Sequence, residues 1–546
     1  MLFYRAVDCP KRNTRNEEIL KKPIEWKIIS SSDVLEERYQ AYGKDKSINT
    51  KLIIEDQLYY ADIASMEIRS IYWEGPVFEM RRGLWYFELS SKFLPCDDKL
   101  AIQLEQGYSK YANDLAAISK AEEYKKYPLF GPYLGQHVLY ISDSVAYIVI
   151  DGITTKVAQA LVGKFSKQDI WGTRLIRDYA NVPKEKQPSS PRKASLKKIP
   201  RPDMSEITPC HLVLVIHGIG QKLFSRDGIY TFATDVSELR ERINTTMDES
   251  NISDRYMILP IQWREIVEFG VSPEPLSKTE DIGLGIGVLQ TNQDEATLPS
   301  LDDIMVPTNP YRTLIKDVAL DLLLYMTEKH RLSMLKTVAT ELNRVHDLFL
   351  KNFPDFKGNV SIIGHSLGTL ISFDLLTMEL KEFDKLGIPK LQFFPNILFL
   401  LGSPISMIRL LNGELIRSVE YDEGTENVKR LKTKYLYNIY HMFDPIAQRI
   451  EPLITRKFPK EPMPAIKVTT VSEEEEDLLI SQLNPLRKRI DFVLQSGYWE
   501  SALSFYSSIS QHSNYWTNSE VTTFLAKELI EIRKHDDLLW RSPQSP

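Results

Sequence analysis

The sequence has little cysteine. Its 546 residues include only three cysteines, Cys9, Cys96 and Cys210, which lie far apart and form no C-x-x-C pair. A disulfide framework or a cysteine zinc site is therefore not expected, and a reducing compartment is favoured. No other metal-ligand spacing occurs either. Any hydrolytic chemistry is thus expected to proceed without a metal ion or another cofactor.

Long apolar runs are also missing. The longest, such as NILFLL and VALDLLLYM, fall far short of the ~20 residues that a membrane-spanning helix needs. The N-terminus lacks the apolar core of a secretory signal, and Asp8, Glu17 and Glu18 argue against a mitochondrial transit peptide. We predict a cytoplasmic, peripherally membrane-associated protein, with a mitochondrial location as the alternative.

An overall basic charge is absent as well, because the formal net charge is −6. Nucleic acid is therefore not an expected partner. The hydrophobic fraction of 43% is typical of a soluble globular protein, and the length predicts about two to four domains. The sequence contains no signal for an oligomeric state.

Basic residues are concentrated in one segment, PKEKQPSSPRKASLKKIPRP at 183–202. Its five prolines and three serines exclude regular structure, and seven Lys and Arg residues against Glu185 give it a charge of +6. We predict a basic linker over 183–206. A weak attraction to anionic membranes is the alternative to a plain tether.

The two sides of the linker differ in pattern. Residues 1–182 are predicted to form a small β-rich domain, because SIYWEGPVFEMRRGLWYFEL alternates aromatic and charged residues around turns. Residues 207–546 contain continuous apolar runs separated by helical patterns, which indicate an α/β fold with a mostly parallel sheet. These runs are HLVLVIHG (211–218), MILPIQW (257–263), NVSIIG (359–364), NILFLLG (396–402) and YLYNIYHMF (435–443).

A candidate nucleophile follows one of these strands. GHSLG (364–368) fits the G-x-S-x-G nucleophile elbow, in which a serine sits on a tight turn between strand and helix. Gly364 and Gly368 are expected to let the two elements pack closely, while the helix N-terminus favours developing negative charge. We predict Ser366 as the nucleophile, the alternative being an incidental serine turn.

The base and the acid are sought downstream, because this fold delivers its triad in the order Ser, acid, His. Of the histidines after Ser366, His441 lies inside a strand pattern and His535 in a charged helical tail. We predict His512, in a polar loop, as the base. The acid should follow a strand, which favours Asp444. The alternative acid, Asp491, begins its strand and is more naturally a supporting residue.

An oxyanion hole is predicted from backbone N–H groups. One donor is the N–H of Leu367, after the nucleophile, and the other comes from HGIGQ (217–221), at Gly218 and Ile219. His217 is expected to brace this loop. The segment GLGIG (283–287) resembles a phosphate loop, but no buried strand precedes it and no Lys-Ser/Thr follows, so we expect a flexible loop or lid.

The sequence resembles the intracellular phospholipase A1 family defined by the DDHD domain. The N-terminal aromatic segment resembles this family's WWE module. LVLVIHGIGQ, VSIIGHSLGTLISFDLL, FLLGSPI, FDPIAQRIEPL, RIDFVLQ and HSNYWTNSEV then follow in the family's order. The four positions behind the family name correspond to Asp444, Asp491, His512 and Glu520. The last departs from the family's aspartate, and the resemblance places the DDHD region at about 390–535.

The resemblance implies hydrolysis of the sn-1 acyl ester of glycerophospholipids such as phosphatidic acid. It also implies the family term metal ion binding, although no ligand set is predicted. The residues alone indicate a serine hydrolase acting on an acyl ester. Two alternatives therefore stay open, a soluble acyl esterase or thioesterase and a catalytically silent lipid-binding trafficking scaffold.

Overall fold

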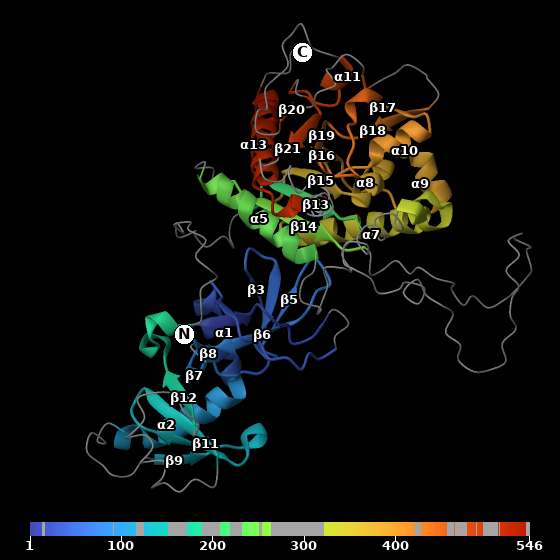
Figure 1. Ribbon diagram of the computed structural model, residues 1–546. Coiled ribbons are helices and arrows are strands. Elements are labelled where there is room, and N and C mark those ends of the chain that lie inside the picture. Colours follow the sequence, from blue (N-terminus) through green and yellow to red (C-terminus); the bar gives the residue numbers. More distant parts are fainter. Residues whose placement is uncertain are drawn as a thin grey trace, which may run out of the picture. The chain divides into compact units, whose positions relative to one another are not determined.

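The computed structural model divides the chain into two compact units, at about residues 1–207 and 208–546 (Figure 1). The structure describes residues 1–13, 17–90, 92–115, 125–150, 172–187, 208–218, 232–249, 254–263, 322–420, 427–455, 463–464, 478–486, 489–494, 512 and 514–541.

The N-terminal unit contains two six-stranded sheets, and every pair of neighbouring strands within them is antiparallel. The first has the order β2-β1-β6-β5-β4-β3 and packs with helix α1 (Ser32–Lys44) around a core that includes Phe3 and Leu35. Its strands are β1 (Phe3–Ala6), β2 (Trp26–Ile28), β3 (Lys51–Ile54), β4 (Tyr59–Asp62), β5 (Glu67–Ser70) and β6 (Phe78–Arg82).

The second sheet has the order β8-β7-β12-β11-β10-β9 and packs against helix α2 (Asp98–Leu115) through Trp85, Leu104 and Tyr140. Its strands are β7 (Trp85–Leu89), β8 (Lys92–Pro95), β9 (Lys125–Pro128), β10 (Gln136–Tyr140), β11 (Val145–Ile150) and β12 (Thr173–Arg177). The aromatic segment 70–89, in which the β pattern was recognised, therefore contributes one strand to each sheet.

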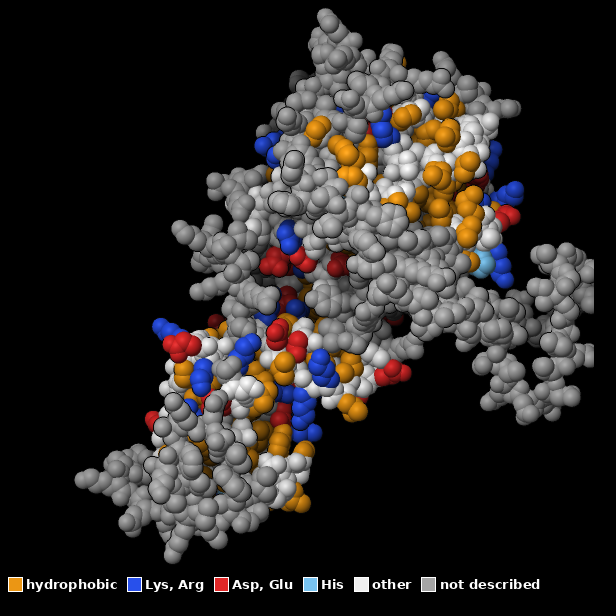
Figure 2. Space-filling view, viewed as in Figure 1, with side chains coloured by type: hydrophobic (Ala, Val, Ile, Leu, Met, Phe, Trp, Pro, Cys, Tyr) orange, Lys and Arg blue, Asp and Glu red, His pale blue; other side chains and the backbone are white. Residues whose placement is uncertain are grey.

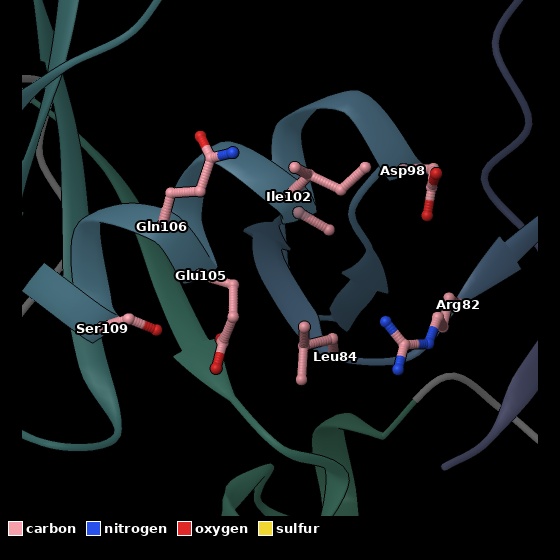
Figure 3. Close-up of a pocket in the computed structure, with 8 residues that line it drawn as sticks. Arg82, Leu84, Asp98, Ile102, Glu105, Gln106 and Ser109 are labelled. Carbon is pink, nitrogen blue, oxygen red and sulfur yellow. The ribbon is translucent and has the colours of Figure 1, made fainter. Parts of the chain in front are cut away.

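A cavity of about 450 Å³ lies beside α2 in this unit, lined on one side by α2 and on the other by Arg82 and Leu84 (Figure 3). Its charged groups already have partners. The Asp98 carboxylate accepts a hydrogen bond from Tyr39, and the Glu105 carboxylate pairs with Arg177 at 2.7 Å.

The C-terminal unit is built on a seven-stranded sheet with the order β14-β13-β15-β16-β19-β21-β20, and all its strand pairs are parallel. This confirms the parallel sheet predicted from the continuous apolar runs, and β13, β14 and β19 are buried at every position. The strands are β13 (His211–Ile216), β14 (Tyr256–Ile261), β15 (Asn359–His365), β16 (Pro395–Leu401), β19 (Tyr435–His441), β20 (Met463–Pro464) and β21 (Asp491–Leu494).

Helices lie on both faces of this sheet, as the need to bury two apolar faces requires. α5 and α13 lie together on one side, while α7, α8, α9 and α10 lie on the other (Figure 1). The helices are α5 (Phe232–Glu249), α7 (Glu328–Asn352), α8 (Leu367–Thr377), α9 (Leu380–Leu386), α10 (Ile405–Leu411), α11 (Leu478–Ser481) and α13 (Ser519–Arg541). A small parallel pair, β17 (Leu415–Ser418) and β18 (Val428–Leu431), lies apart from the main sheet.

The basic linker was predicted to have no regular structure, but its first residues form a short turn. Lys184–Lys186 form a 3₁₀ turn, η4, and the Lys186 ammonium pairs with Glu88 at 2.6 Å. Residues 188–206 of the linker and GLGIG at 283–287 lie outside the described residues. None of the helices among the described residues is long and apolar enough to cross a membrane.

Candidate active site

The elbow at Ser366 joins β15 directly to α8. Ser366 has φ 53° and ψ −124°, a left-handed backbone conformation that side chains rarely adopt. Its N–H still donates to the Leu401 carbonyl of β16 at 3.0 Å, so the strained turn is tied to the sheet. The serine side chain consequently stands at the carboxyl edge of the sheet, where the N-terminus of α8 begins.

Gly364 and Gly368 let the strand and the helix of the elbow pack closely, as predicted. A Cβ at Gly364 would lie 2.8 Å from the Thr369 Cα, and one at Gly368 would lie 2.2 Å from the Ile216 carbonyl oxygen. Both distances are shorter than side-chain carbons tolerate. Larger residues at these positions would therefore push α8 away from β15 and β13.

The loop after β13 touches the nucleophile. A Cβ at Gly218 would lie 2.7 Å from the Ser366 Cβ and 3.1 Å from the Leu367 nitrogen, so the two backbone segments predicted to form an oxyanion hole are in contact. The buried His217 uses its carbonyl to accept a hydrogen bond from the Trp263 indole at 3.1 Å. Ile219, the other predicted donor, lies outside the described residues.

His512 joins the serine to the acid. Its Nε2 lies 2.8 Å from the Ser366 Oγ, and its Nδ1 lies 2.9 and 3.0 Å from the two carboxylate oxygens of Asp444. Since Nδ1 faces a carboxylate, the proton belongs there, and Nε2 is left to accept the serine proton. All three side chains are buried.

Asp444 follows β19 in a tight turn, in which its N–H donates to the His441 carbonyl. Its carboxylate accepts hydrogen bonds from His512, from the Tyr515 hydroxyl at 2.7 Å and from the Ile446 N–H at 2.9 Å. Burial opposes the charge, but these donors together hold the pKa of Asp444 below its usual range. Asp444 is therefore ionised at neutral pH.

Three residues around the cluster were missed by the sequence reasoning. The Tyr515 hydroxyl accepts a hydrogen bond from the His441 N–H while donating to Asp444. Gly402 has φ +60°, and a Cβ there would lie 3.1 Å from the Asp444 carboxylate and 3.3 Å from the His512 Nδ1. Only the position of Tyr515, three residues after His512, offered a local signal.

His365, beside the nucleophile, is the third. Complete burial and the neighbouring His512 lower the pKa of His365 to about 3, so its imidazole is neutral. Its Nε2 lies 2.8 Å from the His512 carbonyl oxygen, which can only accept, so Nε2 carries the proton. The contact fixes the backbone that carries His512.

Asp491 lies away from this cluster. It begins β21 beside Asn438, three residues before the end of β19. Its carboxylate accepts from Asn438 and from the N–H groups of Ile450 and Glu451 at 2.9 to 3.1 Å. Burial and the nearby Glu451 raise the pKa of Asp491 to about 6. Asp491 thus fixes the chain that follows Asp444.

The remaining candidates, Glu520, His535 and His441, lie on α13 and β19. Glu520 is in the first turn of α13, and its N–H donates to the Asn518 side chain at 2.8 Å. His535 lies farther along the same helix and contacts Tyr435, while His441 ends β19. The described residues contain no group of three or more His, Cys, Asp or Glu side chains that could hold a metal ion. The implied metal therefore has no site among them.

Comparisons with known proteins match three domain families to parts of the chain. The DDHD domain family matches residues 391–475 and 467–530, a region that includes Asp444, Asp491, His512 and Glu520. The WWE domain family matches residues 1–82, and a domain family of unknown function matches 125–180. The WWE match thus covers the first antiparallel sheet, while the predicted WWE-like region extended to residue 182.

Curated relatives are similar over most of the chain. A probable mitochondrial phospholipase of Schizosaccharomyces pombe is 27% identical over 97% of this chain and 87% of its own length. Human phospholipase DDHD1 is 25% identical over 73% of this chain and 46% of its own length. The mouse triacylglycerol hydrolase DDHD2 is 24% identical over 80% and 71%. No solved structure matches the chain.

These matches support the resemblance found in the motifs, which is to a DDHD phospholipase A1-like family. They support a lipid-hydrolysing activity of the phospholipase type.

Proposed function

We propose that the C-terminal unit is an α/β-hydrolase and that the protein is a phospholipase A1-type serine hydrolase. It cleaves the sn-1 acyl ester of glycerophospholipids such as phosphatidic acid. The observation that carries the proposal is the bridging position of His512, 2.8 Å from the Ser366 Oγ and 2.9 Å from the Asp444 carboxylate. Nucleophile, base and orienting acid in hydrogen-bond contact are what acyl transfer by a serine requires.

In the proposed mechanism, His512 Nε2 takes the Ser366 proton as Oγ attacks the ester carbonyl. Asp444 holds the opposite ring nitrogen and stabilises the imidazolium that forms. The N–H of Leu367 and the loop at Gly218 stabilise the oxyanion. His512 then protonates the departing lysophospholipid alkoxide. A water molecule, activated by the same imidazole, releases the fatty acid from the acyl-enzyme.

The substrate and location are inferred from the relatives. Their names describe phospholipases and a triacylglycerol hydrolase, so an acyl ester of a glycerolipid is the shared substrate class. The S. pombe relative is named mitochondrial, which favours the mitochondrial alternative over a cytoplasmic location. The basic segment at 183–202 supports reversible contact with anionic membranes.

The experiment is product analysis with the Ser366→Ala protein. Wild-type protein on mixed phospholipid vesicles should release sn-1 fatty acid and 2-acyl lysophospholipid, identified by mass spectrometry. Ser366→Ala should lower the rate by several orders of magnitude, because triad members act as a unit.

Labelling by a fluorophosphonate probe provides the control. The wild-type protein should be labelled and Ser366→Ala should not, with unchanged thermal melting. Hydrolysis retained by the variant would contradict the assigned nucleophile. Cleavage of short-chain esters but not of vesicles would instead indicate a soluble esterase.

A further inference from the structure

Exposed apolar side chains gather on α10 and on the loop after β19. Figure 2 shows hydrophobic side chains on the part of the C-terminal unit where Figure 1 draws α10. On α10, Met407, Leu410 and Leu411 are 51%, 69% and 75% exposed, and Met442 after β19 is 65% exposed. We call these four residues the α10 apolar surface.

The outer face of α10 differs from that of an ordinary surface helix. Ile405, Ile408 and Arg409 point inward and are buried. A surface helix usually presents polar residues opposite its buried stripe. Here the opposite face consists of leucine and methionine instead. Exposed apolar side chains that share one helix face, as Met407, Leu410 and Leu411 do, mark a site of interaction with a partner or a membrane.

The helix that carries this face is firmly anchored. Arg409 is ion-paired with Asp374 of α8 and lies 2.8 Å from Glu414. The same Asp374 carboxylate accepts a hydrogen bond from the Tyr325 hydroxyl at 2.7 Å. α10 is therefore held in place from its buried side. Its apolar outer face is present before any partner binds.

The start of α10 is connected to the candidate active site. α10 begins three residues after Gly402, which contacts both Asp444 and His512. The Gln448 N–H donates to the Ser403 carbonyl at 3.0 Å, and the Ser406 hydroxyl donates to the Arg449 carbonyl. These bonds join the start of α10 to the loop that carries Met442 and Asp444.

We propose that the α10 apolar surface docks into the lipid–water interface from which the enzyme draws its substrate. The inference rests on the proposed lipid hydrolysis, and the exposed leucine and methionine side chains of α10 match acyl chains in polarity. An apolar helical face of this kind lies in the boundary between headgroups and acyl chains. The contact is hydrophobic and persists at high salt, unlike binding through the basic segment at 183–202.

The test uses the full chain and phosphatidylcholine vesicles. In a Ser366→Ala background, which prevents vesicle degradation, Leu410→Ser/Leu411→Ser should weaken vesicle co-sedimentation by about tenfold, at low and at high salt alike. With Ser366 present, the same double variant should hydrolyse vesicles correspondingly more slowly. Its rate on a soluble short-chain ester should not change.

A matched control removes two exposed apolar side chains from the N-terminal unit, with Phe130→Ser/Leu134→Ser, at positions 56% and 78% exposed. This control should bind vesicles like the parent protein. An equal loss in the control, or undiminished binding by the α10 variant, would overturn the proposal. So would light scattering that shows the α10 variant converting a dimer to a monomer while vesicle binding is retained.

The outcomes for docking and for catalysis can be told apart. Failure of the wild-type protein to hydrolyse any ester would reject the proposed function. The sedimentation arm, run with the Ser366→Ala protein, would still decide the docking.

Discussion

Two buried carboxylates, Asp444 and Asp491, have surroundings that differ in kind. Asp444 lies beyond the carboxyl end of β19, and two of its donors are the side chains of His512 and Tyr515. Asp491 lies at the start of β21, and its donors include two backbone N–H groups and the Asn438 amide. Both are buried, so burial alone does not distinguish a reactive group from a structural one.

The difference lies in which other groups the hydrogen-bond donors of each carboxylate contact. His512 holds Asp444 with one nitrogen and faces Ser366 with the other, so a change at Asp444 reaches the nucleophile. Two of the donors to Asp491 are the N–H groups of Ile450 and Glu451, and the Glu451 carboxylate accepts a hydrogen bond from Arg489. A carboxylate aimed at an imidazole can orient a base, whereas one aimed at backbone N–H groups fixes a chain.

The sharpest test of this comparison is a pair of matched amide substitutions. Asp444→Asn should lower kcat by up to ~10,000-fold, because the amide holds the imidazole in the wrong tautomer. Asp491→Asn should mainly lower the free energy of unfolding, by about 1–3 kcal/mol, because an amide cannot satisfy all its present donors. Steady-state rates on a soluble ester and chemical denaturation separate the two. A crippled Asp491→Asn beside a mild Asp444→Asn would reverse the assignment.

A smaller effect is expected at Tyr515, which connects Asp444 to the end of β19. Tyr515→Phe removes the hydroxyl that donates to Asp444 and accepts from the His441 N–H. We expect kcat to fall roughly tenfold, the value of one hydrogen bond to a charged group.

The pH profile distinguishes positioning from packing at Tyr515. The lost bond is one of those that lower the pKa of Asp444, so the loss of rate that follows protonation of Asp444 should begin at a higher pH in Tyr515→Phe. Lower thermal stability with unchanged kcat and pH profile would show that the hydroxyl serves only the fold.

Acidification should lower the stability of the fold through two buried histidines and raise it through Asp491. Burial lowers the pKa of His365 and of His211 to about 3, so the unfolded chain binds protons first and stability falls as pH drops below about 6.5. The raised pKa of Asp491, about 6, has the reverse effect, because the folded chain binds that proton first. Between pH 6.5 and 5, each histidine should lower the free energy of unfolding by roughly 2 kcal/mol, and Asp491 should raise it by about 1 kcal/mol.

Denaturation at pH 7 and pH 5 checks these signs. Asp491→Asn should enlarge the loss of stability on acidification, and His211→Gln should reduce it. A wild-type protein equally stable at both values would contradict the buried neutral histidines.

The parallel sheet and the elbow could be predicted because their signals are local. A strand buried on both faces is apolar at consecutive positions, and Gly364 and Gly368 mark the close approach of α8 to its neighbours. The order of the triad then left few histidines to consider. Asp444 could be preferred because it follows an apolar strand pattern and a proline comes directly after it.

What could not be predicted depends on contacts between distant segments. Tyr515 reaches Asp444 only because the 3₁₀ turn η10 (Asn514–Trp516) packs beside the end of β19. In the sequence, Gly402 resembles any glycine that ends a strand. Only the structure shows that Asp444 and His512 lie beside it. The division of the N-terminal unit into two sheets was also hidden, since β6 and β7 are separated by only two residues yet pair with different partners.

The smallest effect is expected at Glu520, where this chain departs from the family's aspartate. Asn518 accepts the N–H groups of Glu520 and Val521, so it caps α13, while Glu520 supplies a negative charge to the first turn. Glu520→Gln should change kcat less than twofold and stability by at most ~1 kcal/mol, the value of a charge near a helix N-terminus. Asn518→Ala should cost about 1 kcal/mol through the lost cap. Measured beside Asp444→Asn on the same ester, a tenfold or greater loss in Glu520→Gln would give the fourth family position a part in catalysis.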